Sequence, residues 1–554
     1  MKRIFLMLAT LIMVAACADK RPETIYLGGT IYTGVEGQPT AEAVGVIGAR
    51  IVYVGDADTI LKDTRAGVKL VNLQNAVMYP GFIDGHAHLE GVGQRALDFS
   101  LDGVASLEAM VARVADEVEG KPPGMPVVGR GWIETHWPEG RFPSRDDLDD
   151  VSDENPVVLI RADGHALVAN SLALEAAGIN IDTKDPAGGA IERDEAGRAT
   201  GMLIDNAMSL IPFGPADSSE EAVVSRLIKG AEIYAASGWT GMHNMSVPVE
   251  QVKLMETASV QGLLPLRVYN MLNPDGFDLL AEQGGAISPG ALIETHGVKI
   301  YMDGSLGSRG AALKAPYADR PDQSGLLLRD KDETLDLMTR ALKNNIRLSI
   351  HAIGDKANAM ALDWIEEAME EADPGADPRW RIEHAQVISP EDFPRFAELG
   401  VIASMQPSHA IGDLHFAKDR LGEERLEGAY AWRSLIDAGA VIAGGSDAPV
   451  EKGDPRIEFY AAITRKDLNG FSADYWHPEQ AVSREEALKM FTSWPAHAAF
   501  REHELGSIEV GKFADFSVFD TDFMTAPPED ILEAETIMTV IGGAQVWPRV
   551  DSVR

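Results

Sequence analysis

The spacing of apolar and polar residues changes along this chain. Near the N-terminus, short apolar runs such as 51–54 alternate with turn signals such as Gly55, which is typical of a small β-unit. The C-terminal end shows the same alternation of short apolar runs and turn signals, for example in residues 515–519. The two β-rich ends predict one composite sheet domain, built from residues 22–77 and 501–554.

The long middle of the chain alternates helical patterns with short apolar runs, which is the signature of a parallel sheet or barrel. We expect barrel strands at residues 78–84, 239–243, 266–271, 298–302, 346–351, 380–384, 401–405 and 441–445. This pattern predicts the α/β class and a (β/α)8 TIM barrel over residues 78–500. Residues 101–237 are too long for one crossover and contain extra strand-like runs. They predict an inserted subdomain after the first barrel strand.

The charge balance limits the partners. The chain of 554 residues carries 86 acidic against 49 basic residues, a formal net charge of -37. Such a charge argues against binding to nucleic acid or to an anionic membrane face. It could favour cationic substrates, but the explanation that we expect is a solvated acidic surface.

The first 17 residues have the features of a targeting segment. Two basic residues precede the apolar run 4–14, which is too short for a permanent transmembrane helix. The run ends in Val14-Ala15-Ala16-Cys17, which resembles a bacterial lipobox. We therefore expect a lipoprotein lipidated at Cys17, the only cysteine, with its lipid as the sole membrane contact. Ala18 after that cysteine indicates the periplasmic side of the outer membrane. The alternative is a cleaved signal peptide with an incidental cysteine.

Two histidines follow the first predicted barrel strand. Because successive side chains of a strand point to opposite faces, His86 and His88 project the same way. They make half of a metal site, although a hydrogen-bonded histidine pair is the plainer alternative. His351, His384 and Asp447 end three later strands, and strand ends are where barrels assemble their sites. Singly these residues would be core histidines and a turn cap, but together they predict a metal centre.

Lys299 adds a further ligand candidate. Alternation places Lys299, Tyr301 and Asp303 on the interior face of their strand. A buried ammonium group is costly unless it is neutralised, paired or modified. Reaction with carbon dioxide would convert Lys299 to an anionic carbamate ligand. The alternative is a structural ion pair between Lys299 and Asp303.

The chain after the lipobox resembles the metal-dependent amidohydrolase superfamily, in particular the YtcJ-like branch that includes the N-substituted formamide deformylases. The motifs that carry the resemblance are residues 81–88, 303–309, 351–355, 381–385, 445–449 and 506–515. The resemblance implies a (β/α)8 barrel with a flanking β-sandwich, and it implies a homodimer.

The resemblance also implies a binuclear site. One divalent ion would be held by His86, His88 and Asp447, the other by His351 and His384, with carboxylated Lys299 between them. Zinc suits such ligands, and iron, manganese or a single-ion site are the alternatives.

The implied activity is hydrolysis of a non-peptide C–N bond in an amide, formamide or cyclic amide. The ions would supply an ionised water and polarise the carbonyl, and Asp447 would carry the proton. The catalytic residues would be Asp447, His351 and His384. The alternatives are a deaminase or a lactone or ester hydrolase on the same scaffold, and a non-catalytic ligand-binding lipoprotein.

Two residues are candidates for substrate contacts. His165 lies in a stretch, 161–166, that resembles a family segment near the site. Its alternative role is a loop histidine that caps the following helix. Arg309 lies in a Gly/Ser-rich loop and would bind a substrate carboxylate bidentately. A structural loop anchor is the alternative for Arg309.

Overall fold

A computed structural model describes residues 21–548 except 98, 187, 213–218 and 373–374. Within these residues, eight neighbouring parallel strands follow the order β19-β18-β17-β16-β15-β14-β13-β6. Their bounds are β6 Phe82–Ala87, β13 Trp239–Val247, β14 Arg267–Leu272, β15 Ile293–Tyr301, β16 Arg347–Ala352, β17 Arg381–His384, β18 Ile402–Met405 and β19 Ile442–Gly444. The prediction of an α/β chain with a TIM-like barrel is confirmed.

The barrel is brought nearly to closure where β19 meets β6. The backbone N–H of Asp447 donates to the carbonyl of His86, with 2.7 Å between N and O. Two glycines permit this approach, because a Cβ on Gly445 would lie 2.4 Å from the His86 nitrogen and one on Gly85 would lie 2.5 Å from the Gly444 oxygen. The first and last strands therefore lie side by side at the predicted metal residues.

Apolar side chains on the outer face of the barrel pack against the surrounding helices. Leu348 and Ile350 of β16 are fully buried, in one cluster with Met338 of α9 (Lys331–Lys343) and Leu362 of α10 (Asp355–Ala372). Strands buried on both faces are expected in a parallel sheet covered by helices.

The predicted first barrel strand, residues 78–84, is split between two sheets. β5 (Val77–Pro80) pairs with strands of the two chain ends, and only β6 belongs to the barrel. Gly81 separates them. Its N–H donates to the carbonyl of Asp515 across 2.8 Å, and a Cβ there would lie 2.3 Å from the Thr240 hydroxyl. The expected boundary at residue 78 is thus corrected to Gly81, since the apolar run gave no sign of the change of sheet.

The two chain ends form one eight-stranded sheet, as far as the chain is described. Its order is β22-β21-β20-β5-β1-β2-β3, with β4 paired to β1. Their bounds are β1 Thr24–Val35, β2 Gln38–Ile47, β3 Arg50–Gly55, β4 Lys69–Asn72, β20 Phe516–Phe519, β21 Thr536–Ile541 and β22 Ala544–Trp547. The division of this sheet into the two layers of a sandwich stays a prediction.

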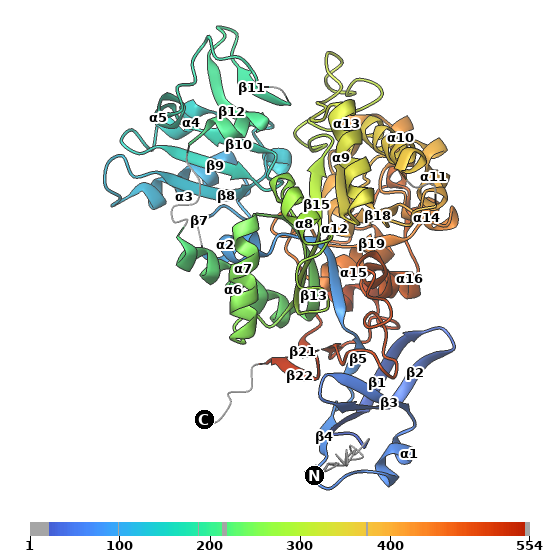
Figure 1. The fold of residues 1–554 in the computed structure, drawn as a ribbon. Coiled ribbons are helices and arrows are strands. Elements are labelled where there is room, and N and C mark those ends of the chain that lie inside the picture. Colours follow the sequence, from blue (N-terminus) through green and yellow to red (C-terminus); the bar gives the residue numbers. More distant parts are fainter. Residues whose placement is uncertain (1–20, 98, 187, 213–218, 373–374, 549–554) are drawn as a thin grey trace, which may run out of the picture.

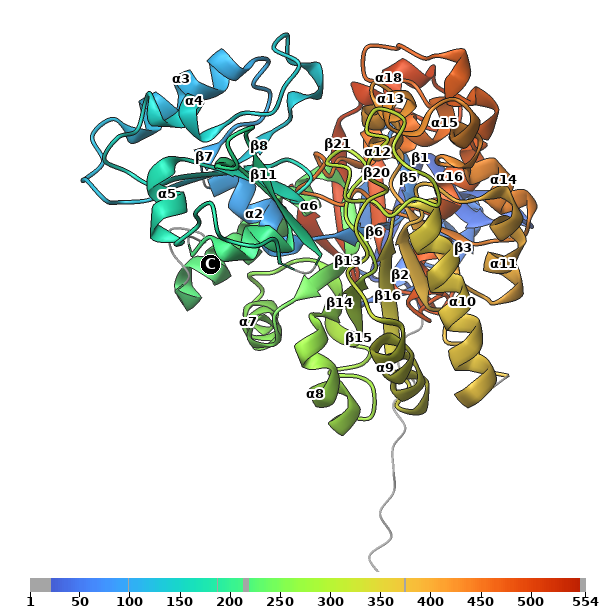
Figure 2. The same ribbon diagram turned by 90° about the horizontal axis from the view of Figure 1, so that it is seen from above.

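The segment between β6 and β13 contains a separate six-stranded sheet of order β11-β12-β10-β9-β8-β7. Its strands are β7 Phe99–Ser100, β8 Val127–Trp132, β9 Val157–Arg161, β10 Ala166–Ala169, β11 Gly189–Arg193 and β12 Ala199–Asp205. This insert sheet lies beside the barrel, while β1 to β4 lie below it (Figures 1 and 2). The insert was expected to reach residue 237, but α6 (Glu220–Ser237) packs into the barrel core through Leu227 and Tyr234.

Among the described helices, none is both long enough and apolar enough to cross a bilayer. The predicted lipobox and Cys17 lie outside the described residues.

Candidate metal centre

A cavity of about 550 Å³ opens at the C-terminal ends of the barrel strands. All six predicted metal ligands line it: His86, His88, Lys299, His351, His384 and Asp447. The insert supplies the facing wall, with Arg130 of β8 and with Asp163, His165 and Asp205. The site therefore lies between the barrel and the insert sheet, and both contribute side chains to it.

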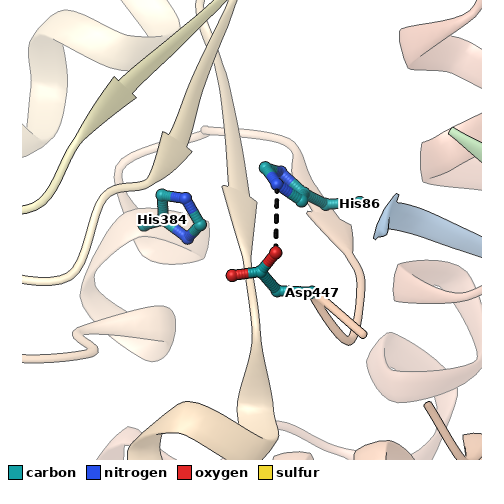
Figure 3. A group of neighbouring side chains, drawn as sticks. All are labelled: His86, His384 and Asp447. Atoms are coloured by element: carbon teal, nitrogen blue, oxygen red, sulfur yellow. Dashed lines mark ion pairs between the residues drawn. The ribbon is translucent and has the colours of Figure 1, made fainter. Parts of the chain in front are cut away.

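His86, His384 and Asp447 form the tightest part of the cluster (Figure 3). One ligand atom from each lies within 4.8 Å of the others, and all three side chains are buried. The ion pair drawn in Figure 3 joins His86 Nε2 and Asp447 Oδ1 across 3.4 Å. Two imidazoles and a carboxylate suit zinc and other divalent transition metals. This group could hold a metal ion.

The backbone at two of these residues departs from regular strand geometry. His384 has a φ of 74° and Asp447 a φ of 57°, so both lie in the left-handed region. Non-glycine residues adopt it at an energetic cost, and such strain clusters at functional sites. The turn at each strand end redirects the side chain. The alternation of side chains along a strand does not predict this direction.

His88 and Lys299 extend the cluster on the side of His86. His88 Nε2 lies 3.1 Å from Asp447 Oδ1, and Lys299 Nζ lies 3.4 Å from His86 Nε2. Lys299 is only 1% exposed, and burial lowers its pKa to about 8. Within the described residues no carboxylate oxygen approaches Lys299 Nζ to within 4 Å.

The alternative ion pair between Lys299 and Asp303 is not formed. Asp303 instead accepts backbone hydrogen bonds from the N–H groups of Ala312, Ile353 and Gly354, at 2.8, 2.9 and 2.8 Å. These contacts occupy the carboxylate in the loops after β15 and β16. Lys299 is therefore buried and has no carboxylate partner, and both features favour its conversion to a carbamate.

His351 completes the cluster beside His384. The two ring centroids lie 4.6 Å apart. The Nε2 atom of His351 is buried without a hydrogen-bond partner in the described structure, and the nearest carboxylate oxygen, on Asp303, is 3.6 Å away. Buried polar atoms are nearly always partnered. An additional ligand at Nε2 would satisfy this atom, so the residues present fit a metal ion.

Hydrogen bonds behind the histidines fix their orientation. The Nδ1 atoms contact Glu383 Oε2 for His86 (2.5 Å), the Met245 carbonyl for His88 (3.1 Å) and Gln406 Oε1 for His384 (2.9 Å). Their Nε2 atoms are therefore available to bind a metal ion in the cavity. Metal-binding histidines usually have the other ring nitrogen held by a hydrogen bond in this way.

The partner of His86, Glu383, was not among the predicted site residues. Glu383 is held in turn by Arg381, with 2.8 Å between Oε1 and Nε. Both are buried and share the inward face of β17, so their alternation with Ile382 was a usable signal. Burial and, next, the charge of Lys299 lower the pKa of His86 to about 4, which keeps its ring neutral and able to bind metal.

The two substrate candidates have different environments. His165 lines the cavity, with 2.7 Å between Nδ1 and Asp205 Oδ1 and 5.2 Å between its ring and that of His351. It does not cap the following helix, α5 (Ser171–Ala176), because Asn170 does so through the N–H of Ala173.

Arg309 is not among the residues that line the cavity. Its guanidinium binds Asp319, with 2.8 Å between Nη2 and Oδ2 and 3.2 Å between Nε and Oδ1. This position fits the alternative of a loop anchor. The cavity instead contains Arg130 and Arg329, which sequence reasoning missed because their approach depends on how the insert and a long loop dock on the barrel.

Comparisons with known proteins agree with this site. The family model described as "Amidohydrolase family" matches residues 69–547. YtcJ of Bacillus subtilis is 33% identical over 95% of this chain and 100% of its own length. The N-substituted formamide deformylase of Arthrobacter pascens is 30% identical over 92% of this chain and 96% of its own.

A solved structure resembles the whole fold as well. It is an uncharacterised metal-dependent hydrolase from Pyrococcus horikoshii, 27% identical, with a TM-score of 0.74 over 91% of this chain and 99% of the other. The predicted resemblance and the assignment as a hydrolase are confirmed. Because the family model spans most of the chain and the relatives align over nearly their whole length, this chain belongs to the amidohydrolase family.

Proposed function

We propose that this chain hydrolyses a non-peptide C–N bond of a small molecule with a metal-activated water. The observation that carries this proposal is the convergence of six ligand-type side chains on one cavity at the C-terminal end of the barrel. The formamide deformylase among the relatives supports an amide or formamide as the bond broken.

The proposed centre is binuclear. His86, His88 and Asp447 would hold one ion, and His351 and His384 the other. Lys299, as its carbamate, would lie between them. The close approach of Asp447 to His86 and His88 and the contact of His351 with His384 support this division. Zinc is the metal that we propose, with iron or manganese as the outcomes that metal analysis would distinguish.

When bound, the ions lower the pKa of a water molecule and polarise the scissile carbonyl. The protein's own groups do the remaining work. Asp447 accepts the proton of the attacking water and delivers it to the leaving nitrogen. Glu383 and Gln406 hold the imidazoles of His86 and His384 in position. His165, oriented by Asp205, faces the substrate from the insert.

The decisive experiment combines metal analysis of the purified chain with a screen of N-formyl, N-acyl and cyclic amides. We expect stoichiometric divalent metal, and an amine and an acid as products. The screen includes a lactone and an aminated heterocycle. Opening of only the lactone to its hydroxy acid, or release only of ammonia, would identify a lactone hydrolase or a deaminase instead. Metal binding without turnover of any compound would favour a ligand-binding lipoprotein.

We also propose that the mature chain is anchored on the periplasmic side of the outer membrane through lipidated Cys17. The homodimer implied by the family resemblance is a further proposal. Analytical ultracentrifugation of the chain without its first 20 residues would test it, and a single species of monomer mass would reject it.

A further inference from the structure

Two arginines line the cavity of the metal centre without a carboxylate partner. Arg130 lies in the insert strand β8, and Arg329 lies between β15 and α9. Within the described part of the chain, neither guanidinium forms an ion pair within 4 Å. Of the other fully buried arginines, Arg161 and Arg381 have such partners, whereas Arg465 is satisfied by the carbonyls of Tyr430 and Trp476.

Arg130 is held in place by a carbonyl, and Asp447 and Asp163 act on its charge only from beyond ion-pair distance. Its Nη2 donates to the carbonyl of Ala162 across 3.0 Å, while its Nε is buried without a hydrogen-bond partner. Gly164 leaves room for the group, because a Cβ there would lie 3.2 Å from Nη2. Burial lowers the pKa of Arg130, as expected for a charge withdrawn from water. A buried donor of this kind lacks an acceptor.

Arg329 approaches from the barrel side. The N–H of the preceding Leu328 donates to the carbonyl of Met302 across 2.9 Å, which ties this segment to the end of β15. Leu328 also packs towards the insert, since a Cβ on Gly188 would lie 2.5 Å from its Cδ2. The half-buried Arg329 therefore stands where the barrel loop meets the insert. Burial lowers the pKa of this guanidinium too.

The carboxylates that line this cavity have other partners than the two arginines, although Oδ2 of Asp205 has no hydrogen-bond partner in the described structure. Asp163 binds Arg161 and accepts from Ser305 Oγ at 2.8 Å. Asp205 binds His165, and Asp447 belongs to the metal centre. The cavity is therefore lined by two guanidinium groups with which no carboxylate of the described residues forms an ion pair.

We propose that the substrate carries a carboxylate, bound by Arg130 and Arg329, so that N-acylated amino acids are the substrate class. This inference rests on the proposed hydrolysis. A guanidinium matches a carboxylate in geometry and charge, and hydrogen bonds between charged groups are stronger than neutral ones. The role first expected for Arg309 thus passes to two residues that face the metal centre.

The test uses a matched pair of substrates with the same scissile bond. The metal-loaded chain is given N-acetylphenylalanine and N-acetylphenethylamine, which differ only in the carboxylate. We expect kcat/KM to favour the acid by about 10- to 100-fold, the range for one or two charge-assisted hydrogen bonds. Arg130→Gln and Arg329→Gln should each remove most of this preference while they leave turnover of the amine-derived compound within about threefold.

Exposed arginines of the same two regions provide controls. Arg198→Gln lies in the insert and Arg320→Gln in the loop before Arg329, and both side chains are exposed. These variants should keep the full preference. Equal turnover of the two compounds by the unmodified chain would overturn the proposal. Equal losses on both compounds in Arg130→Gln and Arg329→Gln would also overturn it, because they would indicate a role in the reaction itself.

A binding measurement separates this inference from the proposed function. Isothermal titration calorimetry of N-acetylphenylalanine and N-acetylphenethylamine is carried out with the Asp447→Asn chain. If neither compound is hydrolysed by the unmodified chain, the proposed amide hydrolysis fails for this class. Tighter binding of the acid, lost in Arg130→Gln, would still support the carboxylate site. Equal or absent binding of both compounds would reject it.

Discussion

The amide of Asp447 and the carbonyl of His86 are joined by a backbone hydrogen bond, with 2.7 Å between N and O. The same two residues approach again through their side chains, across 3.4 Å. One residue follows the last barrel strand and the other lies in the first. The contact that brings the barrel nearly to closure therefore also sets the spacing of the metal ligands.

This coupling predicts the effect of a single methyl group. A Cβ on Gly445 would lie 2.4 Å from the His86 nitrogen and 3.0 Å from Asp84 Oδ1. Gly445→Ala should force β6 and β19 apart, which lowers the free energy of unfolding by about 1–3 kcal/mol and weakens metal binding. Denaturant unfolding and metal titration would measure both effects.

Gly37→Ala is the matched control, because nothing lies within 4 Å of a Cβ at that position. It should change neither quantity. Metal affinity unchanged in Gly445→Ala, despite a lower stability, would mean that closure and ligand spacing are independent.

The proposed proton carrier is tested by Asp447→Asn. An asparagine keeps the side-chain shape but cannot accept the proton, so kcat should fall by about 100- to 10,000-fold. His86 and His384 remain, and much of the metal should therefore stay bound, as mass spectrometry of the metal content would show. Asp377→Asn, with an exposed side chain, should behave as the unmodified chain. Full turnover by Asp447→Asn would refute the assignment.

The carbamate is tested at Lys299. Exchange of the metal-free chain with ¹³C-bicarbonate, followed by metal, should give a carbamate carbonyl signal in the ¹³C NMR spectrum. Lys299→Met should lack this signal and should bind less metal, because the shared anionic ligand is lost. Lys253→Met, whose side chain is 82% exposed, should retain both. If the unmodified chain gives no carbamate signal, Lys299 is not carboxylated, even if Lys299→Met binds less metal.

Local pattern was enough to predict most of the barrel. The strands that carry His351 and Lys299 were expected at 346–351 and 298–302 and are found at Arg347–Ala352 and Ile293–Tyr301. Their alternation of apolar and polar residues follows from having helices on one side and the interior on the other. The inward position of Lys299 follows from the same alternation.

The features that the local pattern did not predict depend on contacts between segments far apart in the sequence. The division of residues 78–84 at Gly81 is set by Asp515 and Thr240, far along the chain. Arg130 reaches the cavity only because the insert docks against the barrel. The left-handed backbone at His384 likewise belongs to a turn whose geometry no strand period encodes. For Glu383, however, the signal was present in the strand and was not used.

The N-terminal expectation is tested by Cys17→Ser in the full-length chain. Without the thiol no lipid is attached, so the protein should move from the membrane fraction to the soluble periplasmic fraction while its specific activity is retained. Metabolic labelling with a palmitate analogue should label only the unmodified chain. A labelled Cys17→Ser chain, or an unlabelled parent, would contradict the lipobox interpretation.

A buried acid away from the metal centre gives a prediction about pH. Glu458 in α15 (Pro455–Thr464) is fully buried, and its Oε2 accepts from the N–H of Ser408 across 3.0 Å. Its Oε1 has no hydrogen-bond partner in the described structure, and burial raises the pKa of Glu458 well above its usual value. The folded state therefore favours the protonated acid. Its contribution to stability is present below the unfolded pKa of about 4.3 and is lost as the pH rises through the folded pKa.

Glu458→Gln has no acidic proton to lose, so it never carries a buried charge, and it keeps an acceptor for the N–H of Ser408. It should therefore melt several degrees above the unmodified chain at pH 8, and this gap should close as the pH falls towards 4. Differential scanning calorimetry at both pH values would measure it, with the exposed Glu398→Gln as a control that should change Tm little at either pH. A gap that stays constant with pH would show that the gain comes from packing rather than from removal of a buried carboxylate.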